Sequence, residues 1–120
     1  MLLRGIRGAT TTEENTRSSL LAATRELLEA LVSANQFSSE DVAAAIFTTT
    51  PDLNAEFPAV AARQMGWKDV PLLCGHEMAV PHSLQKCVRV LLLINTDRSP
   101  QEIVHVYLKA ASNLRSEQLE

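Results

Sequence analysis

The sequence has little of the material from which most metal and covalent catalytic sites are built. Among its 120 residues are only two cysteines, Cys74 and Cys87, which are too far apart for a C-x-x-C pair. Its three histidines follow no metal-ligand spacing. The sequence therefore argues against a zinc site. Because nothing indicates an oxidising compartment, we interpret both cysteines as free thiols.

A long hydrophobic run and a basic surface are also missing. No segment approaches the roughly 20 apolar residues that a membrane helix needs, and the N-terminus lacks the apolar core of a signal peptide. The net charge of −3 argues against binding to nucleic acid or to an anionic membrane surface. We expect a cytoplasmic domain that binds a small molecule.

Arginine is the residue that stands out among those present. Eight of the 11 basic residues are arginines, and two of them lie in expected strands. Arg89 is near the start of the apolar run at residues 88–94, and Arg7 lies in a glycine-flanked strand that opens the chain. A buried guanidinium is costly unless an anion meets it, and its planar fork suits carboxylates. With Glu77 in a third segment, these residues suggest a site for a small polyanion.

The hydrophobic pattern predicts alternating strands and helices. Strands are expected at residues 2–9, 44–50, 70–74 and 88–96. Helices are expected at residues 13–34, 38–43 and 59–65, with a further helix start at 99–102. The capping-box pattern of Thr11 and Glu14 supports the start of the long helix. Residues 103–114 fit either a helix or a short turn that leads into a strand.

This order of elements predicts an α+β fold, a mixed β-sheet covered on one face by a long helix. The second face of apolar strands would stay exposed in a monomer, so we expect oligomerisation through the sheet and sites between subunits. Residues 1–115 should form a single domain, and residues 116–120, which are polar, should form a mobile C-terminal tail.

Many short segments follow the order and spacing of one enzyme family. They are Arg4-Gly-Ile-Arg-Gly-Ala-Thr10, Thr50-Pro-Asp-Leu-Asn-Ala-Glu-Phe-Pro-Ala59, Ala62-Arg63, Gly66-Trp67, Val70-Pro71, Cys74, Glu77-Met78, Leu84, Cys87-Val-Arg89, His105-Val-Tyr-Leu108 and Leu114-Arg115. In these segments the chain resembles the monofunctional, AroH-type chorismate mutases. The resemblance implies a homotrimer that looks like a pseudo-α/β barrel, with three clefts at subunit interfaces. It also implies an isomerase that converts chorismate to prephenate by a pericyclic (Claisen) rearrangement, without a cofactor, in phenylalanine and tyrosine biosynthesis.

The same resemblance implies roles for individual residues. Arg89 is expected to donate hydrogen bonds to the ether oxygen of chorismate, where negative charge develops. Glu77, with Cys74 nearby, is expected to hold the ring hydroxyl and to offset positive charge on the ring. The other matches are substrate-binding or cleft-lining positions, namely Arg7, Tyr107, Arg63, Arg115, Phe57, Ala59 and Leu73. Of these, Arg7 and Tyr107 would share a carboxylate, and Arg63 or Arg115 would close over the site.

Two positions depart from the family pattern, and two other functions stay open. Val60 stands where some relatives carry lysine, and His76 stands where a glutamine often precedes the glutamate. The alternatives are a trimeric imine or enamine deaminase and a non-catalytic module that binds an aromatic or keto acid. Glu77 favours the mutase, because a module that only binds carboxylates needs no acidic residue facing its anion.

Overall fold

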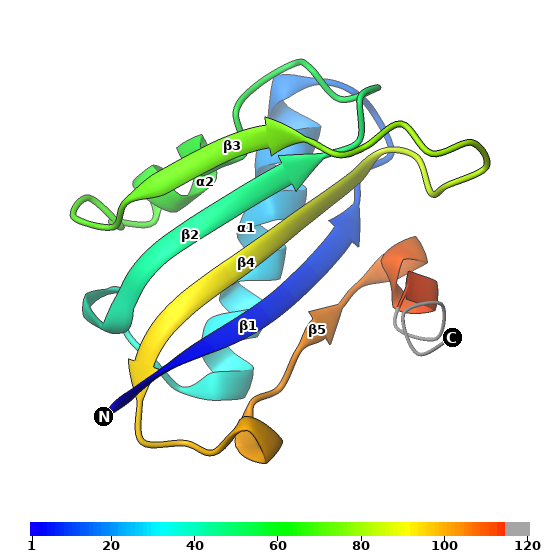
Figure 1. The fold of residues 1–120 in the computed structure, drawn as a ribbon. Helices are drawn as coiled ribbons and strands as arrows, with labels where there is room; N and C mark the ends of the chain where they lie inside the picture. Colours follow the sequence, from blue (N-terminus) through cyan, green and yellow to red (C-terminus); the bar gives the residue numbers. More distant parts are fainter. Residues whose placement is uncertain (115–120) are drawn as a thin grey trace.

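A five-stranded sheet in the order β3-β2-β4-β1-β5 organises the chain (Figure 1). The computed structural model describes residues 1–114, so Arg115 and the tail expected at 116–120 lie outside the described residues. The strands are β1 (Leu2–Thr11), β2 (Val42–Thr49), β3 (Leu72–His76), β4 (Cys87–Thr96) and β5 (Val106–Tyr107). β4 pairs antiparallel with β1 and β2, whereas β3 pairs parallel with β2 and β5 pairs parallel with β1. The predicted α+β class with a mixed sheet is confirmed.

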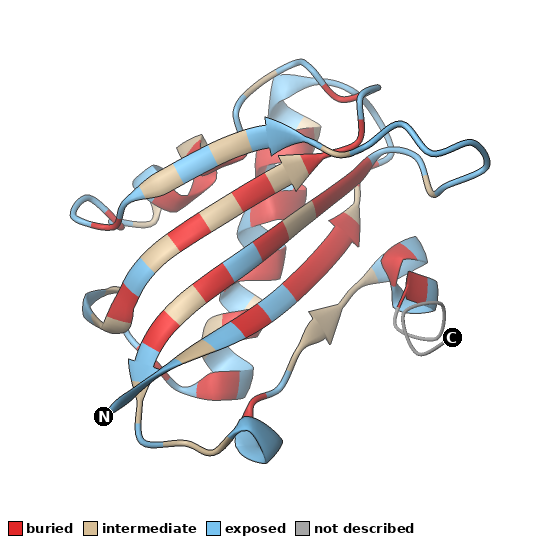
Figure 2. Cartoon of the chain, viewed as in Figure 1, coloured by how far each residue is buried: buried red, intermediate tan, exposed pale blue. Residues whose placement is uncertain are grey.

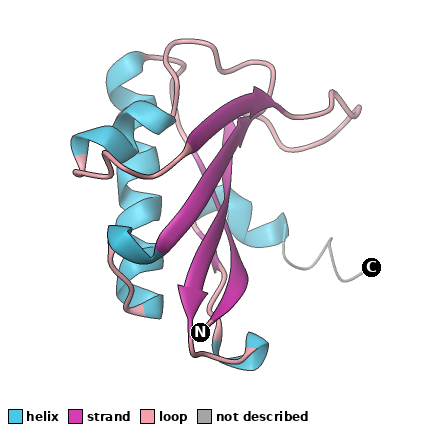
Figure 3. Cartoon of the chain, turned by 60° about the vertical axis from the view of Figure 1, so that its left-hand side comes forward, coloured by secondary structure: helices cyan, strands magenta, loops and turns pink. Residues whose placement is uncertain are grey.

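Both α-helices lie on the same face of this sheet (Figure 3). α1 (Arg17–Asn35) runs across the strands, and the short α2 (Ala59–Gln64) packs beside it. The apolar stripe of α1 meets alternate residues of the strands, so that the core contains Leu27, Leu28, Leu31, Ile6, Phe47, Val90 and Leu92. Because these side chains fill the core, apolar residues recur in the sequence with the period of a helix in α1 and with the period of a strand in the sheet.

The start of α1 differs from the prediction, since the helix begins at Arg17 and not near residue 13. Thr11 is still part of β1, where it pairs with Cys87, and the N–H of Thr12 donates to the carbonyl of Lys86 at 2.9 Å. Thr16 is the N-cap instead, and its side chain accepts a hydrogen bond from the N–H of Ser19 at 3.2 Å. Strand pairing therefore overrides the capping-box pattern of the sequence.

The shorter elements resolve what the pattern left open. The turn expected at residues 38–43 is a 3₁₀ helix, η1 (Ser39–Asp41), after which β2 begins. The helix start at 99–102 is also a single 3₁₀ turn, η2 (Pro100–Glu102). Residues 103–114 contain the strand β5, followed by the 3₁₀ helix η3 (Lys109–Asn113). No helix among residues 1–114 combines the length and the apolar character needed to cross a membrane.

The sheet face that points away from the helices is only partly covered (Figure 2). Near η3, Ala9 and Cys87 are buried together with Ala111. Farther along the strands, Leu91 is 37% exposed and Leu73 is 65% exposed. We call this side the open face. It presents apolar side chains to solvent in the protomer, as the sequence suggested.

β1 lies close to α1 at Gly8, and this contact generates a stability prediction. A Cβ at this position would lie 2.8 Å from Cδ1 of Leu31 and 3.2 Å from Cδ1 of Leu27. Both leucines are fully buried, so Gly8→Ala should lower the free energy of unfolding by about 1–3 kcal/mol through overpacking. A midpoint for thermal unfolding, read by circular dichroism at one protein concentration, would measure this.

Gly5→Ala is the matched control in the same strand. Its added Cβ would lie 3.6 Å from Cδ1 of Leu91, which is an ordinary van der Waals contact. We expect this variant to unfold at or above the wild-type midpoint, because alanine also restricts the unfolded chain. Equal midpoints for the two variants would show that the helix moves away from β1 without penalty.

Candidate active site

Four of the predicted site residues meet in a cavity of about 280 Å³ on the open face. We call it the basic pocket. It is lined by Arg7, Gly8, Ala9, Ile46, Thr48, Glu77, Arg89, Val90, Leu91 and Tyr107. Residues from five separate segments thus converge, and Arg7, Glu77, Arg89 and Tyr107 are the polar members that the sequence singled out.

Strand alternation explains why the arginines point into this pocket. In β4, Val88 and Val90 are buried on the helix side, so Arg89 projects to the open face. In β1, Ile6 is fully buried and Arg7 projects the other way, where it is exposed. The register pairs Ala9 with Arg89, which places the two arginines on neighbouring strands.

Arg89 carries an unsatisfied donor. Its Nε atom is buried and has no hydrogen-bond partner among the described residues. Buried polar groups are almost always hydrogen-bonded, and a charged donor without a partner is especially unfavourable. An anionic or strongly polar ligand atom in the basic pocket would satisfy it. The unpartnered Nε of Arg89 is therefore the clearest sign that the pocket binds a ligand.

Glu77 is fixed by β2 at the end of β3. Its N–H donates to the carbonyl of Thr49 at 2.7 Å, which continues the parallel ladder by one residue. Its Oε1 accepts a hydrogen bond from the hydroxyl of Thr48 at 2.5 Å. The carboxylate is half-buried and faces the same pocket as Arg89.

The C-terminal part of the chain brings Tyr107 to the pocket. β5 lies beside β1, with Val106 opposite Gly8 and Tyr107 opposite Ala9. One residue earlier, the N–H of Arg7 donates to Nδ1 of His105 at 2.9 Å. His105 thus joins the two strands through its ring.

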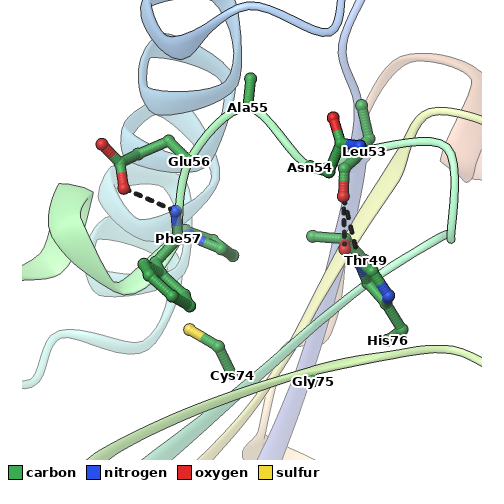
Figure 4. Close-up of a pocket in the computed structure, with 10 residues that line it drawn as sticks. Thr49, Leu53, Asn54, Ala55, Glu56, Phe57, Cys74, Gly75 and His76 are labelled. Atoms are coloured by element: carbon green, nitrogen blue, oxygen red, sulfur yellow. Dashed lines mark hydrogen bonds between the residues drawn. The ribbon is translucent and has the colours of Figure 1, made fainter.

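Cys74 and Phe57 lie elsewhere, in a second cavity of about 410 Å³ (Figure 4). We call it the loop pocket, because residues 53–58 form one wall and Cys74, Gly75 and His76 form the other. The sulfur of Cys74 points toward the ring of Phe57, which is 67% exposed. Nε2 of His76 lies 3.2 Å from the carbonyl oxygen of Leu53 and links the two walls.

The structure does not bring Cys74 to Glu77 within one protomer. Cys74 pairs with Phe47, whose side chain is fully buried beneath the helices, so Cys74 also points to that side of the sheet. Ala59, Arg63 and Leu73 line neither pocket: Ala59 is buried in α2, whereas Arg63 and Leu73 are exposed. Arg115 lies outside the described residues.

Thr48 is a pocket residue that the sequence analysis missed. It lies in the strand expected at residues 44–50, where a threonine fits without any functional reason. The period of two in β2 could have identified it, because Thr48 must face opposite to the buried Phe47. Residues 1–114 contain no group of three or more His, Cys, Asp or Glu side chains that could hold a metal ion.

Comparison with known proteins identifies the family. The family model for chorismate mutase type I matches residues 3–118. The chain belongs to this family. It is 45% identical to the chorismate mutase AroH of Bacillus subtilis over 116 residues. This alignment covers 96% of this chain and 91% of that protein. It is 51% identical to the chorismate mutase AroH of Thermus thermophilus over 115 residues. This alignment covers 95% of this chain and 94% of that protein.

A solved structure agrees with this assignment. The chorismate mutase from Clostridium thermocellum matches with a TM-score of 0.90 and 46% identity, covering 91% of this chain and 97% of that one. The resemblance stated from the sequence segments is therefore confirmed. Of the three functions that were left open, family membership supports the mutase over the deaminase and the non-catalytic module.

The two thiols differ in environment, which predicts different reactivity. Burial raises the pKa of Cys87, although the nearby charge of Arg89 opposes this effect. Since the thiolate is the reactive species, Cys87 should be alkylated far more slowly than Cys74, which is only half-buried. Mass spectrometry of peptides after timed exposure of the native protein to iodoacetamide at pH 8 would measure both rates.

The raised pKa also has a consequence for stability. In the unfolded chain Cys87 loses its proton at lower pH than in the folded one, so its contribution to stability falls as the pH rises above the ordinary thiol pKa. Cys87→Ala should lower the free energy of unfolding at every pH by loss of packing, and it should also remove this alkaline component while leaving the shape of the acid side of the stability curve unchanged. Faster alkylation of Cys87 than of Cys74 would contradict this account of the two sites.

Proposed function

We propose that this chain is a chorismate mutase that binds its substrate in the basic pocket, with Arg89 as the principal catalytic residue. Membership of the family establishes the activity, the rearrangement of chorismate to prephenate in phenylalanine and tyrosine biosynthesis. The observation that carries the assignment to this pocket is the buried Nε of Arg89, which has no partner among the described residues. We further propose that the enzyme is cytoplasmic.

The chemistry needs few functional groups. Chorismate is a dianion, and its rearrangement breaks one C–O bond while a C–C bond forms in a chair-like geometry. The reaction transfers no proton to or from the enzyme and requires no covalent intermediate. An enzyme accelerates such a step by holding the compact conformer and by stabilising the charge that separates in the transition state. A pocket of arginines with one carboxylate suits both tasks.

Each polar residue of the basic pocket then has a distinct role. Arg89 donates to the ether oxygen, which becomes more negative as the C–O bond breaks, and to a carboxylate of the substrate. Glu77 accepts from the ring hydroxyl and offsets the positive charge that develops on the ring. Arg7 and Tyr107 hold a carboxylate that stays charged throughout the reaction, so they contribute mainly to binding.

A second protomer would complete the cleft. The open face exposes Leu73 and Leu91, and the loop pocket holds Phe57 and Cys74 on the other side of the sheet from Arg89. In the homotrimer we propose, the loop pocket of one protomer faces the basic pocket of its neighbour. Cys74, Phe57, Ala59, Leu73 and Arg63 would then reach a substrate bound to Arg89 of the adjacent chain, with Arg63 or Arg115 closing over it.

Substitution of Arg89 is the direct test of the catalytic assignment. Loss of one preorganised donor at a developing oxyanion typically lowers the rate by about 10²–10³, and a charged donor should contribute at least as much. Arg89→Ala should therefore lower kcat by at least this factor, measured by the loss of chorismate absorbance in the ultraviolet. Arg89→Lys should also be badly impaired, because an ammonium group cannot span the ether oxygen and a carboxylate as a planar fork does.

Arg7→Ala serves as the comparison within the same pocket. Because Arg7 meets a group that is charged before and after the reaction, its loss should raise KM more than it lowers kcat. Arg89→Ala with kcat within about tenfold of the wild type would exclude Arg89 as the principal catalytic residue.

Mixed trimers would test the shared cleft. Cys74→Asp places a carboxylate in a cleft that binds a dianion and should block binding, whereas Arg89→Ala removes the catalytic donor. The two inactive variants are mixed in equal amounts, unfolded together and refolded. About one quarter of the clefts should then combine two intact halves. Activity should rise toward that fraction of the wild type.

Two controls accompany this experiment. Each variant refolded alone should remain inactive and should give the same mass by light scattering as the wild type. A mixture as inactive as its components, or an active wild-type monomer, would show that a single protomer contains the whole site.

A further inference from the structure

Thr48 lies between the two oppositely charged residues that the proposed mechanism uses. In the sheet register it pairs with Arg89 of β4 on one side and with Gly75 of β3, two residues before Glu77, on the other. Its side chain is half-buried on the open face and lines the basic pocket. Its hydroxyl donates to Oε1 of Glu77 at 2.5 Å.

Glu77 and Arg89 line one pocket without forming an ion pair. Among residues 1–114, no carboxylate oxygen of Glu77 lies within 4 Å of a nitrogen of Arg89. This separation needs a cause, because opposite charges in a partly dry cavity attract each other strongly. If the two side chains paired, the guanidinium would lose the free donor that its buried Nε now offers, and the carboxylate would lose an acceptor.

We infer that Thr48 is a positioning residue, which holds the Glu77 carboxylate away from Arg89 and so keeps both groups available to the substrate. The inference rests on the proposed function of this pocket and deepens it. A hydrogen bond to an ionised acceptor is short and strong, so a single hydroxyl suffices to select one orientation of a carboxylate. The backbone bond from Glu77 N–H to the Thr49 carbonyl limits the motion further.

The test compares Thr48→Val, which keeps the shape but removes the hydroxyl, with Thr48→Ser, which keeps the hydroxyl. In the valine variant Glu77 should turn toward Arg89, and kcat should fall by about 10- to 100-fold, the range expected for a hydrogen bond to a charged group. KM should change by less than about threefold, since Arg7 and Tyr107 still bind the carboxylate. Thr48→Ser should restore kcat to within about threefold of the wild type.

A double-mutant cycle with Glu77→Gln shows whether Thr48 acts through Glu77. The neutral amide cannot form an ion pair with Arg89, so adding Thr48→Val to Glu77→Gln should change kcat by less than about threefold. An equal loss of kcat from Thr48→Val in both backgrounds would overturn the inference, because Thr48 would then act on the sheet or on the substrate directly. If the valine variant does not fold, Thr48→Ala carries the same comparison.

The cycle also separates this inference from the proposed function. Glu77→Gln with wild-type kcat would remove Glu77 from the mechanism, yet a freed Glu77 in Thr48→Val would still inactivate Arg89, so the inference would stand. A crystal structure of Thr48→Val supplies an independent result. An oxygen of Glu77 within 4 Å of an Arg89 nitrogen would support the inference, and an unchanged Glu77 would refute it.

Discussion

One layer of helix on a five-stranded sheet is the constraint on which the rest of this structure depends. α1 and α2 cover a single face, so every strand has one side in a dry core and one side that needs another partner. This second side carries the charged residues of the proposed site. Near η3 the open face is covered by Ala111, and its middle holds the basic pocket. Farther along the strands it exposes apolar side chains. Helices on both faces would cover the side of the sheet from which Arg89 projects.

The basic pocket shows how a sheet can present a guanidinium group to a ligand. Arg89 is anchored between β1 and β2, so the backbone that carries it belongs to the best-paired strand of the sheet. Burial raises the pKa of the neighbouring Cys87 thiol, which favours its neutral form beside the arginine. An anion that enters the pocket would satisfy the buried Nε of Arg89, which links the cost of burying this donor to binding.

The sequence revealed those features that follow from simple periodicity. The stripe of Leu27, Leu28 and Leu31 and the alternation around Arg89 come from the geometry of helix and strand, and both could be predicted. The start of α1 could not, because two local signals competed and the pairing of Thr11 with Cys87 depends on a segment far along the chain. The side of the sheet to which Cys74 points likewise depends on its register with Phe47.

The candidate site was foreseen to a similar extent. Arg7 and Arg89 could be singled out because a charged side chain within an apolar strand needs a partner. Thr48 could not, since threonine fits a strand without any functional reason and its partner Glu77 is distant in sequence. The tertiary placement of uncharged polar residues is what a single sequence conceals most effectively.

The short β5 has a consequence for motion within the site. This strand contributes Tyr107 and pairs with the edge of the sheet through Val106 and Tyr107. The His105 ring and the hydrogen bond from the N–H of Leu108 to the carbonyl of Ala9 extend this attachment by one residue on each side. A short strand at the edge of a sheet opens locally at a lower free energy than the central strands do. The two walls of the basic pocket should therefore differ in rigidity, because Tyr107 lies on the short edge strand and Arg89 on the central one.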